Sequence, residues 1–303
     1  MNRITLKSCP LCSAAQVEPA LTCMDHYVSG ETFRLFRCRE CGFVFTQDFP
    51  DETEIGRYYD TPDYISHSDS RRGVVNTLYH WVRAVRLGQK ARLLERELHR
   101  KRGTLLDIGT GTGYFPHFMK LRGWRVEAME KDARSRAFAR ARFGLEVRPD
   151  DAWDKWAEGQ FDVVTLWHVM EHLQHLDEAW TRISHLTAMD GLLVVAVPNR
   201  LSWDARRYGA HWAAWDVPRH LWHFVPQDME RLARKHGWRV DAVLPMPLDA
   251  YYVSIMSERY RHAKWPVAKG MLAGLRAALC TVGKPEGSSS LTYVMRRGDG
   301  NVG

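Results

Sequence analysis

The chain has 303 residues, of which 45% are hydrophobic and 26% charged, and its formal net charge is +7. This composition can bury a substantial core, which excludes a disordered chain and suits one large domain with a small appendage. No apolar run approaches the ~20 residues that cross a bilayer, and the first residues lack the apolar region of a signal peptide, so we expect a cytoplasmic protein.

Four of the six cysteines form two Cys-x-x-Cys pairs near the N-terminus. Cys9 and Cys12 make the first pair, Cys38 and Cys41 make the second, and 25 residues separate them. Each pair can form a turn that directs two thiolates at one ion, and four thiolates complete a tetrahedral Zn²⁺ site. Because lasting disulfides are rare in the cytosol, we predict a zinc ribbon over residues 1–48.

Residues 49–102 are expected to form a connector whose second half is helical, because apolar residues recur there at helical spacing. Residues 71–102 carry ten Lys or Arg against two Glu. Such a basic face attracts nucleic acid, anionic lipid or phosphorylated metabolites, but it is also the ordinary composition of a solvated helix face. Nucleic-acid binding therefore stays an alternative.

From residue 103 to residue 298, strand and helix patterns alternate, which predicts a parallel sheet covered by helices. The expected strands are 104–108, 125–129, 145–147, 161–166, 192–197, 240–244 and 291–295. The expected helices are 114–122, 133–143 and 226–236. An insertion over residues 246–289 precedes the last strand, and residues 299–303 are expected to be a disordered tail.

The first of these strands runs into a glycine-rich turn with Gly109, Gly111 and Gly113 and then into a helix. Glycines let backbone approach a ligand closely, and a helix N-terminus offers free N–H groups. An acid, Asp107, stands two residues before the first glycine, which suits a cationic amino-acid ligand better than a pyrophosphate. Glu130 ends the second strand, where a carboxylate can accept ribose hydroxyls.

These residues resemble the first two motifs of class I S-adenosylmethionine (SAM)-dependent methyltransferases. The resemblance implies an α/β fold, with a Rossmann-like sheet of seven strands and helices on both faces, and SAM as the cofactor. The residues that it implies for SAM are Asp107, Gly109, Gly111, Gly113, Glu130, Asp150 or Asp151, Trp167 and His168. Among these, Glu130 would bind the ribose, and Asp150 or Asp151 would contact the adenine amine. A plain tight turn is the alternative.

His168, Glu171 and His172 follow the fourth strand at positions i, i+3 and i+4, so on a helix they share one face and could bind a divalent metal. Their pattern also matches His-x-x-Glu-His of some metalloproteases, an interpretation that we reject because a methyltransferase strand precedes it. Ubiquinone-pathway O-methyltransferases and small-RNA 2′-O-methyltransferases carry Glu-x-x-Glu-His here and use it for a metal. This chain has His168 where they have the first Glu. A hydrogen-bonded helix start that lines the SAM pocket is the alternative.

An aromatic and histidine-rich stretch over residues 212–224 follows the fifth strand. Its Asp-x-Pro-Arg-His run resembles that of a broad methyltransferase family in sugar and polysaccharide pathways. Histidine is the usual acid or base near neutral pH, so we expect a general base here, with His220 first, then His168 or His223, and Tyr251 as a further candidate. A packed lid without chemistry is the alternative.

The combination of a zinc ribbon with these motifs is similar to the nucleotide-sugar C-methyltransferases, and this similarity extends to about Leu244. Beyond it, inside the insertion, apolar residues recur at helical spacing among basic ones. A basic amphipathic helix over residues 264–284 can lie on a membrane surface, although such a helix more often covers a core or forms a dimer face.

The leading hypothesis is SAM-dependent methyl transfer to an oxygen or carbon of a small metabolite, such as a sugar, a polysaccharide precursor or a lipid-linked intermediate. An RNA-modifying methyltransferase that uses the ribbon and the basic connector is the first alternative, although the aromatic residues do not lie among the basic ones. A non-catalytic regulator that binds SAM or zinc is the second.

Overall fold

The computed structural model describes residues 2–60 and 74–298, and the side chains of all of these except residues 74–82. The chain divides into two compact units. Unit 1 comprises Met1–Asp60, His168–Leu176 and Val195–Gly303, and unit 2 comprises Thr61–Trp167 and Asp177–Val194. The domain boundaries that the sequence predicts after residues 48 and 102 stay predictions. The tail over residues 299–303 lies outside the described residues.

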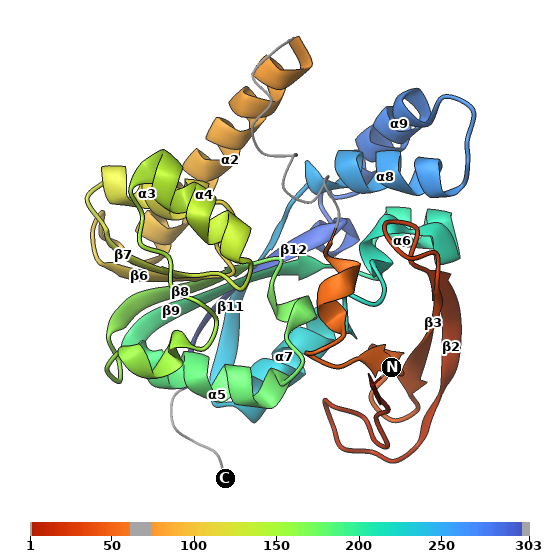
Figure 1. Ribbon diagram of the computed structural model, residues 1–303, viewed down its shortest axis with the longest axis horizontal. Coiled ribbons are helices and arrows are strands. Elements are labelled where there is room, and N and C mark those ends of the chain that lie inside the picture. The colour runs from red at the N-terminus through yellow and green to blue at the C-terminus, as the bar shows by residue number, and fades with distance from the viewer. Residues whose placement is uncertain (1, 61–73, 299–303) are drawn as a thin grey trace. The chain divides into compact units, whose positions relative to one another are not determined.

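Unit 2 is built on parallel strands with helices on both sides. Its strands are β6 (Thr104–Ile108), β7 (Arg125–Met129), β8 (Phe161–Trp167) and the first part of β9 (Thr187–Pro198). Its helices are α2 (Val74–Glu97), α3 (Tyr114–Leu121), α4 (Ala133–Phe143), η2 (Ala152–Lys155) and most of α5 (Leu176–Leu186). Strand β6 pairs in parallel with β7 and with β8. Helices α3 and α4 lie on one side of these strands and α5 on the other (Figure 1), as expected.

Local sequence explains where these elements begin and end. The apolar residues of β6 and β8 are buried except for Trp167 at the end of β8, which is typical of strands covered on both faces. Helix α4 begins after Asp132, whose side chain accepts a hydrogen bond from the Ser135 amide. It ends at Gly144, which has a left-handed backbone with φ of 62°.

The principal sheet has six strands in the order β11-β12-β9-β8-β6-β7, with β11 (Trp238–Pro245) and β12 (Ser290–Arg297) paired antiparallel. The expectation of seven strands is wrong for the described part of the chain. The segment 145–147 forms no strand, and the residue that follows it makes a single bridge, between Met129 and Arg148. Arg148 makes both hydrogen bonds of this bridge, from its amide to the Ala128 carbonyl and from the Glu130 amide to its own carbonyl.

The N-terminal part of unit 1 contains two small sheets. The first pairs β1 (Arg3–Ile4) with β5 (Phe49–Pro50). The second has the order β10-β4-β3-β2 and consists of β2 (Val17–Met24), β3 (Thr32–Cys38), β4 (Val44–Gln47) and β10 (Trp222–His223). The N-terminal segment therefore shares a sheet and a core with residues far along the chain, since Val217 packs in one apolar cluster with Phe33 and Leu35.

The rest of unit 1 is helical. Its helices are η1 (Ile55–Tyr58), η3 (Met170–His172), α6 (Trp203–Tyr208), η4 (Gly209–His211), η5 (Ala213–Trp215), α7 (Pro226–Lys235), α8 (Asp249–Tyr260), α9 (Pro266–Leu279) and η6 (Pro285–Gly287). The insertion predicted over residues 246–289 thus contains the paired helices α8 and α9 (Figure 1). Within the described residues, no helix combines the length and apolarity needed to cross a membrane.

Candidate active site

The glycine-rich turn between β6 and α3 depends on left-handed backbone at three positions. Gly109, Gly111 and Gly113 have φ of 67°, 57° and 82°. A Cβ atom on Gly113 would lie 2.9 Å from the Cβ atom of Ala139, so this glycine lets the turn pack against α4. A Cβ on Gly111 would meet nothing within 4 Å, so its backbone borders open space that a ligand can enter.

Glu130, at the end of β7, is tied to this turn. Its carboxylate accepts hydrogen bonds from the Gly111 amide at 2.7 Å and from the Asp132 amide at 2.9 Å. Burial raises the pKa of Glu130, and these amide donors oppose that shift. The two backbone bonds hold the carboxylate at the mouth of the turn while each oxygen keeps a lone pair for a hydroxyl group.

Asp107 lies beneath the turn and is only 2% exposed. The Thr165 hydroxyl on β8 donates a hydrogen bond of 2.6 Å to its carboxylate. Burial raises the pKa of Asp107 to about 6, although the bond from Thr165 and the charge of Lys90 counteract it. The acid predicted to face the methionine part of SAM is thus anchored to the neighbouring strand.

Lys90 on α2 belongs to the same region, although no motif in the sequence indicates it. Its ammonium lies 4.1 Å from the ring centroid of Trp167 and 5.3 Å from that of Phe115, within range of cation–π attraction. Asp150 and Asp151, in contrast, are exposed. Their predicted contact with adenine stays a prediction.

Two features of this region fit SAM. The Asp107 and Glu130 carboxylates match its cationic sulfonium and amino groups and its ribose hydroxyls. The open space beside Gly111 would admit a ligand against the backbone. All these residues belong to unit 2.

In unit 1, the expectation that His168, Glu171 and His172 share a helix face is wrong. Only Met170–His172 are helical, in the short η3, and His168 precedes it with a left-handed φ of 59°. Its imidazole lies 3.1 Å from Asp249 Oδ2 and 3.5 Å from Glu171 Oε1. Desolvation alone would lower the pKa of His168, but these two carboxylates raise it to about 9. The two carboxylates therefore favour the protonated form of His168.

The structure assembles a different trio, in which His220 takes the position expected for His168. Glu171, His172 and His220 each have a ligand atom within 4.8 Å of the others. Glu171 is fully buried, and its two carboxylate oxygens have no hydrogen-bond partner among the described residues. Burial and the neighbouring His220 lower the pKa of His172 to about 4. A buried carboxylate facing two imidazoles is a plausible set of donors for a divalent cation.

The predicted base candidates after β9 differ in their surroundings. His220 is 9% exposed, and its Nδ1 lies 2.9 Å from the Ala214 carbonyl oxygen. Its Nε2 lies 3.8 Å from Asp216. His223 is more deeply buried and bonds to the Thr46 hydroxyl at 3.0 Å. Burial and nearby cations hold the pKa of His223 well below its usual range, so its imidazole is neutral.

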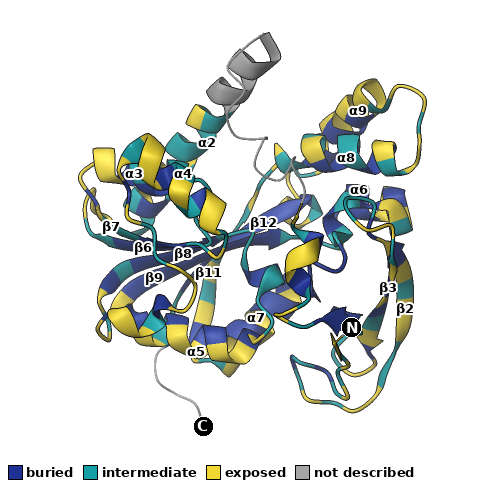
Figure 2. Cartoon of the chain, viewed as in Figure 1, coloured by how far each residue is buried: buried dark blue, intermediate teal, exposed yellow. Residues whose placement is uncertain are grey.

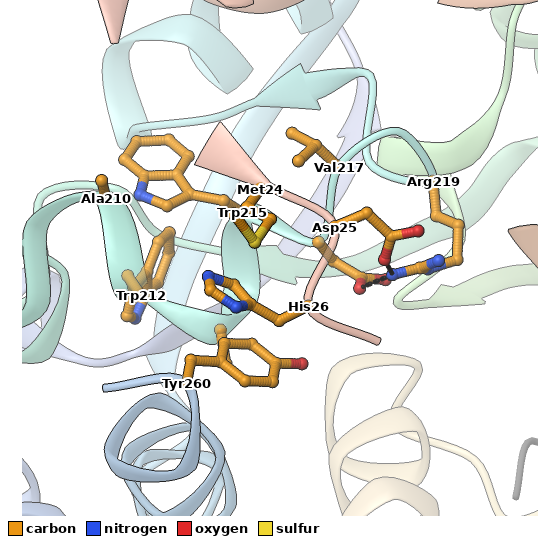
Figure 3. A pocket seen from close by; sticks show the side chains of 11 residues that line it. Met24, Asp25, His26, Ala210, Trp212, Trp215, Val217, Arg219 and Tyr260 are labelled. Atoms are coloured by element: carbon orange, nitrogen blue, oxygen red, sulfur yellow. Dashed lines mark hydrogen bonds and ion pairs between the residues drawn. The ribbon is translucent and has the colours of Figure 1, made fainter. Parts of the chain in front are cut away.

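The remaining aromatic residues of the 212–224 stretch serve mainly as packing. Trp212 is buried and donates its indole N–H to Asp204. A small pocket beside it is lined by His26, Trp215 and Tyr260 among others (Figure 3). Its free volume of about 10 Å³ is enough for roughly one water molecule, so it is no acceptor site in this conformation. Tyr251, the further base candidate, lies on α8.

The four predicted zinc ligands meet in unit 1. The Sγ atoms of Cys9 and Cys41 are 3.5 Å apart, those of Cys12 and Cys38 are 3.6 Å apart, and all four lie within 4.8 Å of one another. Zn–S bonds of ~2.3 Å in a tetrahedron separate the sulfur atoms by about 3.8 Å. Backbone amides of Leu11 and Cys41 also point at two of the sulfurs, which would stabilise thiolates.

Comparison with known proteins gives three findings. Residues 80–243 match a family described as a methyltransferase domain. The ubiquinone biosynthesis O-methyltransferase of Caulobacter sp. (strain K31) is 39% identical over 103 residues, which cover 32% of this chain and 41% of the relative. Its counterpart from Caulobacter vibrioides is 36% identical over 104 residues, with the same coverage. The chain thus matches only about two fifths of the length of these curated relatives.

Among solved structures, the 1,6-didemethyltoxoflavin-N1-methyltransferase of Burkholderia thailandensis aligns with a TM-score of 0.51. The alignment covers 91% of this chain and 100% of that one at 15% identity. That structure contains 1,6-didemethyltoxoflavin and S-adenosylhomocysteine. At this identity, the likeness concerns the fold alone.

Proposed function

Since the chain belongs to the methyltransferase-domain family, we propose that it is a SAM-dependent enzyme that methylates an oxygen or carbon of a small-molecule acceptor. The acceptor classes that we favour are sugars, polysaccharide precursors and lipid-linked intermediates. The observation that carries the proposal is the buried cluster of Glu171, His172 and His220. It offers acid–base groups, two of which directly follow a strand of the methyltransferase sheet in the sequence. The small-molecule activity named for the curated relatives agrees with it.

In this proposal, the turn and its two acids hold SAM. Glu130 accepts the ribose hydroxyls, and Asp107 supplies negative charge to the methionine part. Bound SAM supplies a methyl group already activated on a sulfonium, so the protein has to align the acceptor and remove its proton.

His220 is our first candidate for the base. Its Nε2 lies 3.8 Å from Asp216, a carboxylate that would stabilise the imidazolium formed when His220 takes a proton. Two carboxylates face His168, Asp249 at 3.1 Å and Glu171 at 3.5 Å, and both favour its protonated form, so we assign it the role of a cation held by them. His223 is enclosed by Thr46 and Trp215 and ranks last.

Two metal ions are part of the proposal. Cys9, Cys12, Cys38 and Cys41 would bind a structural Zn²⁺, supported by their sulfur separations. In a second arrangement, which excludes His220 as the base, the trio around Glu171 would bind a divalent cation that polarises the acceptor oxygen. It is supported by the buried Glu171 carboxylate, which has no hydrogen-bond partner among the described residues. This trio differs from the set that the sequence predicts, which has His168 in place of His220.

The test is a transfer assay with methyl-labelled SAM and separate pools of sugar nucleotides, polysaccharide precursors, lipid-linked intermediates and RNA. We expect label in one small-molecule pool, a large loss of rate with His220→Ala, and no loss with His185→Ala, an exposed control. Label that appears only in RNA would overturn the small-molecule assignment. An unchanged rate in His220→Ala would remove His220 as the base.

A further inference from the structure

Helix α9 and its flanks expose large apolar side chains. Trp265 is 72% exposed, Leu272 71%, Leu279 62% and Val282 79%. Val267, Met271 and Leu275 add to them. Figure 2 shows the exposed positions along α9. We call this set of seven residues the α9 outer face.

The inner face of α9 explains why these residues point outward. It consists of small residues, which let the helix approach α8 closely. A Cβ on Gly270 would lie 2.4 Å from Ile255 Cα, and one on Gly274 would lie 2.6 Å from Tyr251 Cα. Ala273 joins the buried cluster beneath. A helix that merely covers a core turns its large apolar residues inward, whereas α9 does the opposite.

Cations surround the α9 outer face. Exposed basic residues occur before, within and after the helix, at Arg261, Lys264, Lys269, Arg276 and Lys284. The sequence has no Asp or Glu between residues 259 and 285. An apolar surface with such a cationic rim, and with no acid in the same stretch of sequence, is complementary to an anionic lipid surface, on which each such cation near the headgroups strengthens binding roughly fivefold.

We propose that the α9 outer face docks on anionic lipid membranes. With 14 residues, α9 is about 21 Å long, which is too short to span the hydrocarbon core but sufficient to lie in the headgroup region. Trp265 belongs to the residue type enriched at membrane interfaces, and the Lys264 ammonium lies 5.7 Å from its ring centroid. A second copy of the chain fits this face less well, because a symmetric contact would set one cationic rim against the other.

The test is cosedimentation of the full chain with phosphatidylcholine vesicles, with and without phosphatidylglycerol. We expect binding to the mixed vesicles that weakens with added salt. Leu272→Ser combined with Leu279→Ser is expected to weaken it by about tenfold or more, because both side chains lose apolar contact. Lys264→Gln with Lys269→Gln is expected to weaken it by roughly tenfold or more on anionic vesicles only.

Leu121→Ser is the matched control, since Leu121 is 74% exposed on α3 and lies far from α9 in the sequence. It is expected to bind like the unmodified chain. Circular dichroism of each variant checks that the fold persists. Two results would overturn the proposal: no binding of the unmodified chain to the mixed vesicles, or equal binding by the Leu272/Leu279 double variant. Self-association that this double variant abolishes, without vesicle binding, would assign the face to a second copy instead.

Discussion

Arg219 and Asp25 lie 194 residues apart in the sequence and form a buried ion pair, with 2.9 Å between Nη2 and Oδ1. Arg219 also bonds to Asp216 at 2.6 Å, and Figure 3 shows its guanidinium beside Asp25. The Asp-x-Pro-Arg-His run therefore has a structural task in addition to any chemistry, because it holds the segment after β2 against the 212–224 stretch.

Replacing this arginine is expected to destabilise the protein. Arg219→Met would leave two carboxylates without their cation, and breaking a buried pair in this way costs about 3–5 kcal/mol. Chemical denaturation followed by circular dichroism measures the loss. Arg37→Met is the matched control, since Arg37 sits in an exposed ion pair with Glu18 that is worth little. Equal stabilities of the two variants would contradict a structural role for the Arg219 network.

Most of the fold could be predicted because its signals are local. The strands at 104–108 and 125–129 and the helix at 133–143 occur where apolar periodicity and glycine stops predicted them. The segment 145–147 shows the limit of such reasoning. Leu145 and Val147 alternate with a polar residue in a way that suggests a strand, but whether they pair depends on neighbours distant in sequence.

The candidate sites also divide into features that local spacing predicts and features that depend on tertiary packing. The glycine turn, Glu130 and the cysteine pairs have fixed spacings, so the sequence indicates them directly. Lys90, Asp249 and the grouping of His220 with Glu171 carry no such spacing. They come together only through tertiary packing, and the left-handed backbone of His168 redirected its side chain in a way that helical periodicity cannot reveal.

Glu130 provides a test of the cofactor site. Glu130→Ala is expected to raise the dissociation constant for SAM by roughly tenfold to a hundredfold, because hydrogen bonds to a charged group contribute about 1.5–3 kcal/mol. Isothermal titration calorimetry measures it. Glu127→Gln, on the same strand, serves as the control and should bind normally. Unchanged affinity in Glu130→Ala would show that its carboxylate serves the Gly111 and Asp132 amides alone.

Removal of metal tests the cysteine cluster. The purified chain is expected to contain a single Zn²⁺ by mass spectrometry, and chelation is expected to lower its melting temperature, because a structural zinc site adds its binding energy to folding. Cys38→Ser should lose the ion, whereas Cys280→Ser, at an exposed position outside the cluster, should retain it. A protein that is free of zinc and equally stable with or without chelator would refute the site.

The paired carboxylates around His168 give a prediction about pH. Because Asp249 and Glu171 raise its pKa to about 9 in the folded state, the stabilisation from this cation is complete below the unfolded value of about 6.5 and is lost as pH rises through about 9. Asp249→Asn should lower the pKa of His168 and reduce the stability that is lost as pH rises. NMR titration of the imidazole measures the pKa, and melting curves at several pH values measure the stability. Asp190→Asn, with a highly exposed side chain, should change neither. If His168 titrates near its ordinary value in the unmodified chain, it is neutral at neutral pH, and it returns to the list of candidate bases beside His220.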